Sequence, residues 1–208
     1  MIILWTVCAF VSGSLMFSYW LGLIARTNIK NVGDGNPGAS NLWRAAGYKW
    51  GIVGILLDFL KGYLILIGLS SSVNGYEIVP LAIAPIIGHV YSPFLKGKGG
   101  KAIAVTFGVW SALTQFEVAL VYALILALLL GLTKVIIPNK PTSTDADGLQ
   151  VVVGMLFVVI YLCIRDFPNE IRWVGFGNFV VLGYTHRNEF NQILRKILRK
   201  VNRSDKQG

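Results

Sequence analysis

A glycine-rich polar stretch, Asn28–Gly47, carries side chains and backbone suited to binding phosphate. Its glycines follow the spacing G-x-G-x-x-G, which lets a backbone turn sharply and approach a ligand closely. Backbone N–H groups in such a turn form an anion-binding concavity, and Arg44 adds a planar fork that fits phosphate oxygens. A plain glycine-rich turn is the alternative. A dinucleotide-binding turn is excluded, because the stretch follows an apolar run rather than a strand. The candidate phosphate-binding residues are Gly33, Asp34, Gly35, Asn36, Gly38, Ser40, Asn41 and Arg44.

A second polar stretch, Gly88–Thr106, interleaves three lysines with glycines. It does not match the P-loop pattern, which needs a glycine five residues before Gly100 and a Ser or Thr after Lys101. Lys101 follows two glycines, and we expect this segment to open a helix whose N-terminal N–H groups and dipole favour phosphate. The alternative is that the lysines only anchor the chain on the cytoplasmic side. The candidate residues here are Lys98, Gly99, Gly100 and Lys101.

Two smaller polar groups complete the set. The segment His186–Glu189 follows the last apolar run; a lone histidine is usually structural, but this one lies on the same predicted side as both glycine-rich stretches. Asp58 and Lys61 lie within an apolar run, where each charge alone costs about 2.5–3.5 kcal/mol. Their i, i+3 spacing predicts a structural ion pair. Metal-binding and zinc-protease patterns are absent, so no metal site is expected.

The elements that position these groups must be membrane helices. The chain has 208 residues, of which 54% are hydrophobic and 14% charged, and its mean hydropathy is +0.62. Soluble domains carry about 25% charged residues, so an ordinary soluble domain is excluded. A membrane span needs about 20 apolar residues. We expect an all-α polytopic protein with about seven spans, several of them short; five or six spans with re-entrant segments is the alternative. The apolar runs are Ile2–Ile24, Gly51–Ser70, Ile78–Leu95, Ala102–Leu113, Val118–Ile137, Leu149–Ile164 and Ile171–Tyr184.

The distribution of charge predicts the orientation. The formal net charge is +9, and most Lys and Arg residues fall on alternate inter-span segments, beginning with the segment after Ile24. The positive-inside rule then places the N-terminus outside and the C-terminus in the cytoplasm. We expect residues 1–187 to form one membrane domain. Residues 188–208 are expected to form a basic amphipathic tail helix at the membrane surface, with Phe190, Ile193, Leu194, Ile197, Leu198 and Val201 on its apolar face.

In order and approximate spacing, these motifs resemble those of the PlsY-type glycerol-3-phosphate acyltransferases of bacterial membranes. The resemblance covers most of the chain and includes Gly13-Ser14, which adds Ser14 to the candidate residues. The matching segments are Gly13-Ser14, Gly33–Arg44, Leu57–Gly62, Gly88-His89, Gly97–Ala102 and His186–Glu189. The chain departs from the pattern in several places: Asp34 stands for Ser, Gly97 for an aromatic residue and Ala102 for Gly, and Asn188-Glu189 inverts a Glu-Asn order.

The resemblance implies transfer of a fatty acyl group from acyl phosphate to the 1-hydroxyl of glycerol 3-phosphate, giving lysophosphatidic acid and inorganic phosphate. It implies a multi-pass protein of the inner membrane whose site faces the cytoplasm. No cofactor, nucleic acid or obligatory protein partner is implied.

Roles follow from the same resemblance. Arg44 and Lys101 would bind phosphate, Asn36 and Ser40 would orient it, and His186 would polarise or deprotonate the acceptor hydroxyl. Lys98 would hold a second phosphate or the acyl carbonyl. Lys101, His186 and Asn36 are thus the candidate catalytic residues, and Asn188 and Glu189 join the substrate-binding set.

Two other functions remain open. Asp34 places a negative charge where phosphate is expected, and at about 4 Å two like charges repel by about 4 kcal/mol at an effective dielectric constant of about 20. A different phosphorylated acceptor on the same fold is therefore one alternative. The intramembrane charges Asp58 and Lys61 motivate the other, a lipid-binding or transport protein without turnover. The polar motifs cluster at one face and no internal repeat is found, which disfavours transport.

Overall fold

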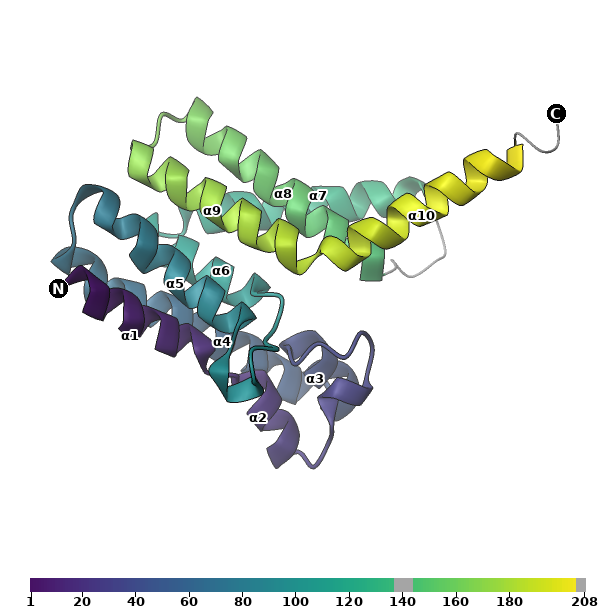
Figure 1. Cartoon of the computed structure of the whole chain (residues 1–208), viewed down its shortest axis with the longest axis horizontal. Coiled ribbons are helices and arrows are strands. Elements are labelled where there is room, and N and C mark those ends of the chain that lie inside the picture. The colour runs from purple at the N-terminus through teal and green to yellow at the C-terminus, as the bar shows by residue number, and fades with distance from the viewer. Residues whose placement is uncertain (137–143, 205–208) are drawn as a thin grey trace.

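The computed structural model describes residues 1–136 and 144–204, and the regular structure in these two ranges is entirely helical (Figure 1). Within them, the side chains of residues 136, 144–146, 193, 196, 197 and 199–204 are not described. The expected all-α fold is confirmed. The α-helices are α1 (Ile2–Ser14), α2 (Phe17–Ile24), α3 (Ala39–Ala46), α4 (Tyr48–Leu69), α5 (Ile78–Val90), α6 (Ile103–Leu113), α7 (Glu117–Ile136), α8 (Thr144–Ile164), α9 (Asn169–Thr185) and α10 (Arg187–Ser204).

Five stretches of the described ranges are long and apolar enough to cross a membrane. The shorter helix α6 is apolar as well, and α9 contains 17 residues. The chain is therefore a multi-pass membrane protein, and each predicted apolar run contains a helix. The five stretches are Ile2–Ile24, Tyr48–Ser72, Gly75–Leu95, Glu117–Val135 and Asp147–Ile164.

The first span differs from the expected continuous helix. Helix α1 ends at Ser14, Leu15 is extended (φ −63°, ψ 121°), and α2 follows. The break releases two carbonyl groups: Ser14 O accepts a hydrogen bond from Ser92 Oγ at 2.6 Å, and Leu15 O accepts one from Lys61 Nζ. An unsatisfied carbonyl is costly in apolar surroundings, so these two partners explain how a membrane span tolerates the break.

Glycines allow α1 and α5 to pack backbone against backbone. A Cβ atom at Gly13 would lie 2.0 Å from Pro85 O, and one at Gly88 would lie 2.2 Å from Phe10 O. Small residues at such crossings let membrane helices approach closely. The motif glycines Gly13 and Gly88 thus have a packing role, and they fix the helix that carries His89.

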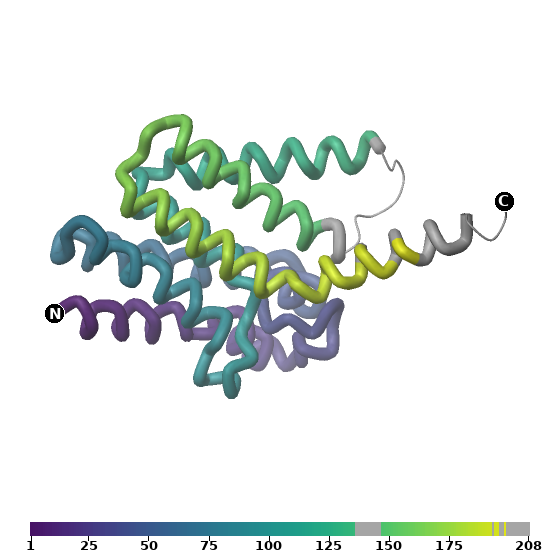
Figure 2. The backbone as a smooth tube through the Cα atoms, turned by 45° about the horizontal axis from the view of Figure 1, so that its top comes forward, coloured from purple at the N-terminus to yellow at the C-terminus, as the bar shows by residue number. Residues whose placement is uncertain are grey.

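The remaining helices stack on this pair. Helix α4 packs against α6, and α9 lies along both α5 and α8, as the tube in Figure 2 shows for the α8–α9 hairpin. Trp110 of α6 is fully buried, and its Nε1 donates to Asn178 Oδ1 of α9 at 3.0 Å. This bond ties α9 to α6 inside the bundle.

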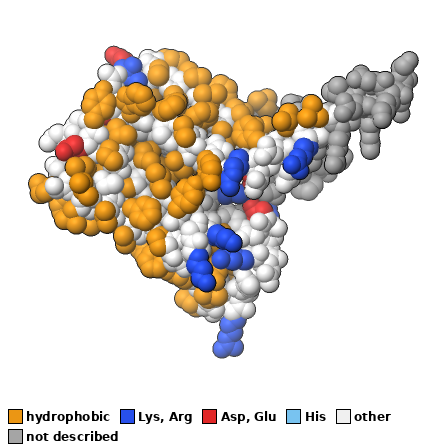
Figure 3. Space-filling view, viewed as in Figure 1, with side chains coloured by type: hydrophobic (Ala, Val, Ile, Leu, Met, Phe, Trp, Pro, Cys, Tyr) orange, Lys and Arg blue, Asp and Glu red, His pale blue; other side chains and the backbone are white. Residues whose placement is uncertain are grey.

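Most of the Lys and Arg side chains on the face shown in Figure 3 lie at one end of the molecule. On the face shown in Figure 3, Lys and Arg side chains cluster where α3, the α5–α6 loop and the start of α10 lie, whereas most of the remaining surface is hydrophobic. The loops that carry the candidate residues therefore share one end of the bundle.

Candidate active site

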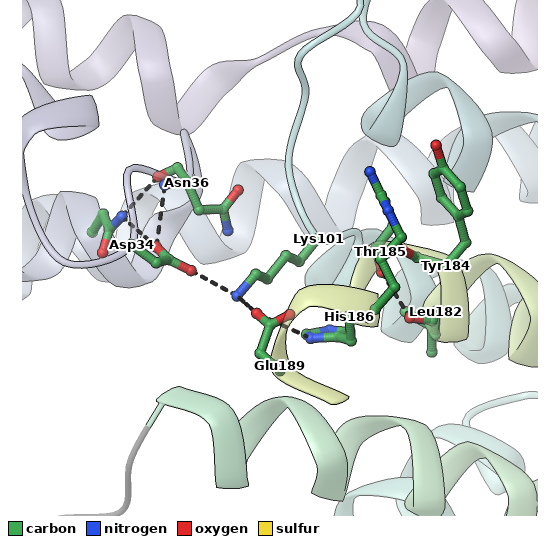
Figure 4. A network of polar contacts seen from close by, with 10 residues as sticks. Asp34, Asn36, Lys101, Leu182, Tyr184, Thr185, His186 and Glu189 are labelled. Atoms are coloured by element: carbon green, nitrogen blue, oxygen red, sulfur yellow. Dashed lines mark hydrogen bonds and ion pairs between the residues drawn. The ribbon is translucent and has the colours of Figure 1, made fainter. Parts of the chain in front are cut away.

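Lys101 lies between two carboxylates that come from distant parts of the chain (Figure 4). Its Nζ contacts Asp34 Oδ2 at 2.6 Å and also pairs with Glu189 Oε1. Asp34 lies in the loop before α3, Lys101 in the loop before α6, and Glu189 in the first turn of α10. The three polar segments singled out from the sequence therefore converge on this lysine.

The loop that carries Asp34 is organised by the amide of Asn41. Asn41 Nδ2 donates to Asp34 Oδ1 and to the carbonyl oxygen of Asn36, both at 2.9 Å, and the Asn36 N–H donates to Asp34 Oδ1 at 3.1 Å. Gly33 has φ +59°, and a Cβ atom there would lie 2.5 Å from Asn41 Oδ1. The sequence predicts that Asn41 binds phosphate, but its amide N–H groups hold the loop closed.

The two glycines before Lys101 serve a close backbone contact. The Gly99 N–H donates to Val90 O and the Gly100 N–H to His89 O, each at 2.9 Å. These N–H groups, predicted to face phosphate, therefore already have partners. Helix α6 begins at Ile103, two residues after Lys101, because Ala102 is left-handed (φ 61°) and turns the chain into the helix.

Two helix N-termini offer further backbone N–H groups at the same place. Gly38 and Ala102 are the N-caps of α3 and α6, and neither helix has a side-chain cap hydrogen bond. The first N–H groups of a helix have no intrahelical partner, and the helix dipole makes that end positive. Because Ser40 of α3 and Ala104 of α6 line the same cavity, both N-termini face it.

Three cavities meet at Lys101 and Asn36, which line all of them. The apolar cavity, of about 630 Å³, is walled by Trp43, Ile55 and Phe107. Trp43 is 45% exposed and Ile55 44% exposed, so this cavity reaches the hydrophobic outer surface. Arg44 lies with Lys101 at its polar end.

The other two cavities are lined mainly by polar residues. The central cavity, of about 120 Å³, is lined by Asp34, Arg44, Asp147 and His186 in addition to Lys101 and Asn36. The outer cavity, of about 380 Å³, is lined by Lys98, Arg187 and Asn188 on the side of α10. Arg44 and Lys101 line both the apolar and the central cavity, which is the convergence that the phosphate-binding prediction requires.

Lys101 and the carboxylate of Asp34 each stabilise the charged form of the other. Burial lowers the pKa of Lys101, but hydrogen bonds to Asp34 and Glu189, with the charges of both, outweigh burial and raise its pKa above the usual value. Burial raises the pKa of Asp34, but hydrogen bonds from Lys101 and the Asn36 N–H, with the charge of Lys101, bring it below its usual value. Lys101 and Asp34 are therefore both charged at neutral pH.

His186 lies at the junction of α9 and α10 and is 1% exposed. Neither ring nitrogen has a hydrogen-bond partner among the described residues; Nδ1 is 3.8 Å from Glu189 Oε1. Burial lowers the pKa of His186 to about 4, the charge of Lys101 acts in the same direction, and Glu189 and Asp34 oppose it. A neutral imidazole that lines the central cavity can accept a proton or a hydrogen bond from a ligand.

Asp58 and Lys61 form the ion pair that their spacing predicts, with Nζ and Oδ1 2.9 Å apart and both side chains almost fully buried. Ser18 Oγ donates to Asp58 Oδ2 at 2.5 Å, and Lys61 Nζ lies 2.7 Å from His89 Nδ1. A charged lysine has no acceptor, so His89 Nδ1 must accept this bond and Nε2 must carry the ring proton. The pair thus links α2, α4 and α5 next to the loop that carries Lys101.

Most predicted residues line at least one of the three cavities at this end of the bundle; of the others, Gly33 and Gly35 lie in the Asp34 loop, Glu189 pairs with Lys101, and Ser14 lies apart. Ser14 is buried on α1, its Oγ donates to Phe10 O at 2.7 Å, and it is not among the residues that line the three cavities. Asp147 and Gly148 of α8 also line the central cavity, although no sequence motif points to them. A Cβ atom at Gly148 would lie 2.8 Å from His186 Nδ1, so this glycine makes room for the imidazole.

No group of three or more His, Cys, Asp or Glu side chains in the described ranges could hold a metal ion. Cys8 and Cys163 are free thiols.

Comparisons with known proteins agree on one family. A family model described as glycerol-3-phosphate acyltransferase matches residues 3–196. The chain is 39% identical over 194 residues to glycerol-3-phosphate acyltransferase 1 of Thermotoga maritima, covering 90% of this chain and 95% of that protein. It is 27% identical over 188 residues to the glycerol-3-phosphate acyltransferase of Aquifex aeolicus, covering 89% of this chain and 92% of that protein.

Solved structures give the same result. The crystal structure of PlsY (YgiH), an integral membrane glycerol 3-phosphate acyltransferase, in its glycerol 3-phosphate form superposes with a TM-score of 0.80 at 26% identity. Its lysophosphatidic acid form gives 0.79 at 25% identity. Each comparison covers 94% of this chain and 92% of the other.

Proposed function

Because this chain belongs to the glycerol-3-phosphate acyltransferase family, we propose that it transfers a fatty acyl group from acyl phosphate to the 1-hydroxyl of glycerol 3-phosphate. The products are lysophosphatidic acid and inorganic phosphate. One observation carries the proposal: an apolar cavity and two polar cavities meet at the same lysine, Lys101. An enzyme that joins a lipid chain to a water-soluble phosphate ester needs such a junction.

The apolar cavity suits the acyl donor. Trp43, Ile55 and Phe107 offer apolar walls for the chain, while Arg44 and Lys101 meet the phosphate at the polar end. The N-termini of α3 and α6 add N–H groups and positive dipole ends there. An acyl phosphate fits this division into an apolar and an anionic part.

The central cavity suits the acceptor. His186 and Asn36 line it with Lys101, so an acceptor phosphate held by this lysine brings a neighbouring hydroxyl toward the neutral imidazole while Arg44 stays with the donor phosphate. The hydroxyl oxygen attacks the acyl carbonyl carbon, the bond from that carbon to the phosphate oxygen breaks, and the hydroxyl proton passes to His186 or to the leaving phosphate. Positioning and charge stabilisation supply the rate, because the acyl group is already activated. Lys98, in the outer cavity, holds the second phosphate or the acyl carbonyl.

The topology proposed with this function has seven spans, with the N-terminus outside and the C-terminus in the cytoplasm. The gathering of Lys and Arg at one end supports it, since cytoplasmic segments carry the excess of positive charge. Helix α10 (Arg187–Ser204) is proposed to lie at the inner face of the inner membrane as a basic amphipathic helix. Of the apolar face predicted for it, Ile193, Ile197 and Val201 lie outside the described side chains.

The decisive experiment measures acyl transfer by the purified, reconstituted protein with acyl phosphate and glycerol 3-phosphate. K101A and R44A should each abolish transfer while the protein still inserts into membranes. K49A is the matched control, because Lys49 is an exposed lysine at the start of α4 and is not among the residues that line the three cavities. Near-normal transfer by both site variants would remove the proposed site.

Asp34 favours a second candidate, a different phosphorylated alcohol as acceptor. Asp34 Oδ2 lies 2.6 Å from Lys101 Nζ, the group that an acceptor phosphate is expected to contact. The same assay with a panel of phosphorylated alcohols separates the two: turnover with glycerol 3-phosphate supports the first candidate, and turnover with another acceptor alone supports the second.

A further inference from the structure

We propose that Asp34 and Glu189 are internal anions that occupy Lys101 until a substrate phosphate displaces them, so that these two carboxylates set the affinity of the site for phosphorylated ligands. The identity of those ligands rests on the proposed function. The affinity for phosphate itself can be measured without turnover.

The contacts of Lys101 leave little room for a further anion. An ammonium group has three N–H donors, and Lys101 commits two of them to Asp34 Oδ2 and Glu189 Oε1. Its side chain is 19% exposed, and that of Glu189 is 8% exposed. A phosphate that uses only the third N–H would lie beside both carboxylates, and the repulsion between these anions favours displacement of one carboxylate.

The charges around the central cavity point the same way. Arg44 and Lys101 supply two positive charges, and Asp34, Asp147 and Glu189 supply three negative charges. A phosphate dianion thus meets no net positive charge before the cluster rearranges.

The contact to Asp34 breaks more readily than the contact to Glu189, because the Asp34 side chain is the more exposed of the two. Asp34 Oδ1 is held by Asn41 and by the Asn36 N–H, whereas Oδ2 contacts Lys101. Glu189 is more deeply placed, against Gly148 of α8. Because a lysine side chain is long and flexible, Lys101 can turn from Asp34 Oδ2 to a phosphate while Oδ1 continues to hold the loop.

D34S and E189N each replace a carboxylate with a neutral side chain that is no larger than the native one. Each removes one competitor for Lys101 and leaves the lysine in place.

The test measures the binding of inorganic phosphate to the full-length protein in lipid nanodiscs by titration calorimetry at neutral pH. We expect D34S to bind phosphate about tenfold more tightly than the native chain, since a hydrogen-bonded charge pair no longer has to break. E189N should tighten binding in the same direction. In transfer assays, the KM for glycerol 3-phosphate should fall by a similar factor.

D147N is the matched control. Asp147 lines the same cavity, but no ion pair to Lys101 is found for it within the described ranges. Its substitution removes the same charge without removing a competitor, so binding should tighten by less than about twofold. If D147N and D34S tighten phosphate binding equally, the affinity depends on the total negative charge around the cavity and not on the Asp34–Lys101 ion pair. That result would overturn the inference.

Folding and function can be separated from the inference. Thermal unfolding of D34S without phosphate shows whether the variant folds. Phosphate should raise the unfolding midpoint of D34S more than it raises that of the native chain, because a tighter ligand stabilises the folded state more at the same concentration. Unchanged or weaker phosphate binding by folded D34S overturns the inference. Tighter binding together with absent acyl transfer in every variant and in the native chain would instead overturn the proposed function and leave the inference standing.

Discussion

The carbonyl oxygen of His89 accepts the N–H of Gly100 at 2.9 Å, and a Cβ atom at Gly99 would lie 1.9 Å from that same oxygen. The contact is between two backbones, so no side-chain rotation can relieve it. The loop that presents Lys101 is therefore fixed directly on α5.

We predict that G99A displaces this loop and lowers acyl transfer at least about a hundredfold, because a misplacement of about 1 Å at a reacting group costs that much. The measurement is kcat in reconstituted vesicles, with protein amount determined from the same sample. G183A is the control: a Cβ atom at Gly183 of α9 would meet open space, with no neighbouring atom of the described chain within 4 Å, so this variant should retain native activity. Native activity in G99A would contradict the fixed position of the loop.

A second prediction concerns the buried pair of Asp58 and Lys61. K61M leaves the Asp58 carboxylate without its cation in apolar surroundings and should lower the free energy of unfolding by about 3–5 kcal/mol. The double variant D58L/K61M removes both charges and should be more stable than K61M alone. Unfolding midpoints in one detergent test this, and a double variant less stable than K61M would show that the pair does more than neutralise itself.

The third prediction follows from the lowered pKa of His186. The folded chain holds this imidazole neutral down to about pH 4, whereas an unfolded histidine binds a proton near pH 6.5. Between these values the unfolded state binds more protons, so stability falls as the pH falls from 6.5 to 4, by about 3 kcal/mol in total. Lys101, Glu189, Asp34 and Asp147 surround the ring, and the carboxyl pKa of Asp34 lies below its usual value, outside this window.

Unfolding midpoints measured from about pH 3 to about pH 8 check this prediction. H186Q should flatten the dependence between pH 6.5 and pH 4 and leave the dependence at lower pH. Parallel curves for the native chain and H186Q would assign the slope to other groups.

A fourth prediction concerns the apolar cavity. Ala104 lines it beside Phe107, so A104L should narrow the space and shift the preferred acyl chain toward shorter donors. The KM for long acyl phosphates should rise several-fold, since each buried CH₂ contributes about 0.8 kcal/mol, while kcat with short donors stays close to native. A uniform loss of activity across chain lengths would count against this cavity as the acyl site.

How far the sequence predicts the site depends on the range of the interaction. The pairing of Asp58 with Lys61 follows from i, i+3 spacing on one helix. The contact of Lys61 with His89 joins positions 28 residues apart, and periodicity carries no information on such a pair. Composition predicts the helices, but it gives no sign of the break at Leu15, where the partner of the freed carbonyl lies 46 residues away.

Residue type also leaves open which partner a polar group chooses. The sequence predicts that Asn41 and the N–H groups of Gly99 and Gly100 bind phosphate. In the structure they donate hydrogen bonds to other groups of the protein and hold their loops in place. Local backbone partners are already in place in the folded chain, and a ligand must compete with them. Gly148 carries no signal in the sequence, because it merely precedes the apolar run that begins at Leu149. Its role is visible only from the ring of His186 packed against it.

The meeting of three cavities at Lys101 has a consequence for the order of events. The fatty donor can enter laterally from the bilayer past Trp43. The polar acceptor can enter from water past Lys98, so the two substrates use separate entrances. Neither substrate then blocks the approach of the other, so initial-rate kinetics should show random rather than compulsory order. The two products likewise separate by solubility: the lipid enters the bilayer and the phosphate enters the surrounding water.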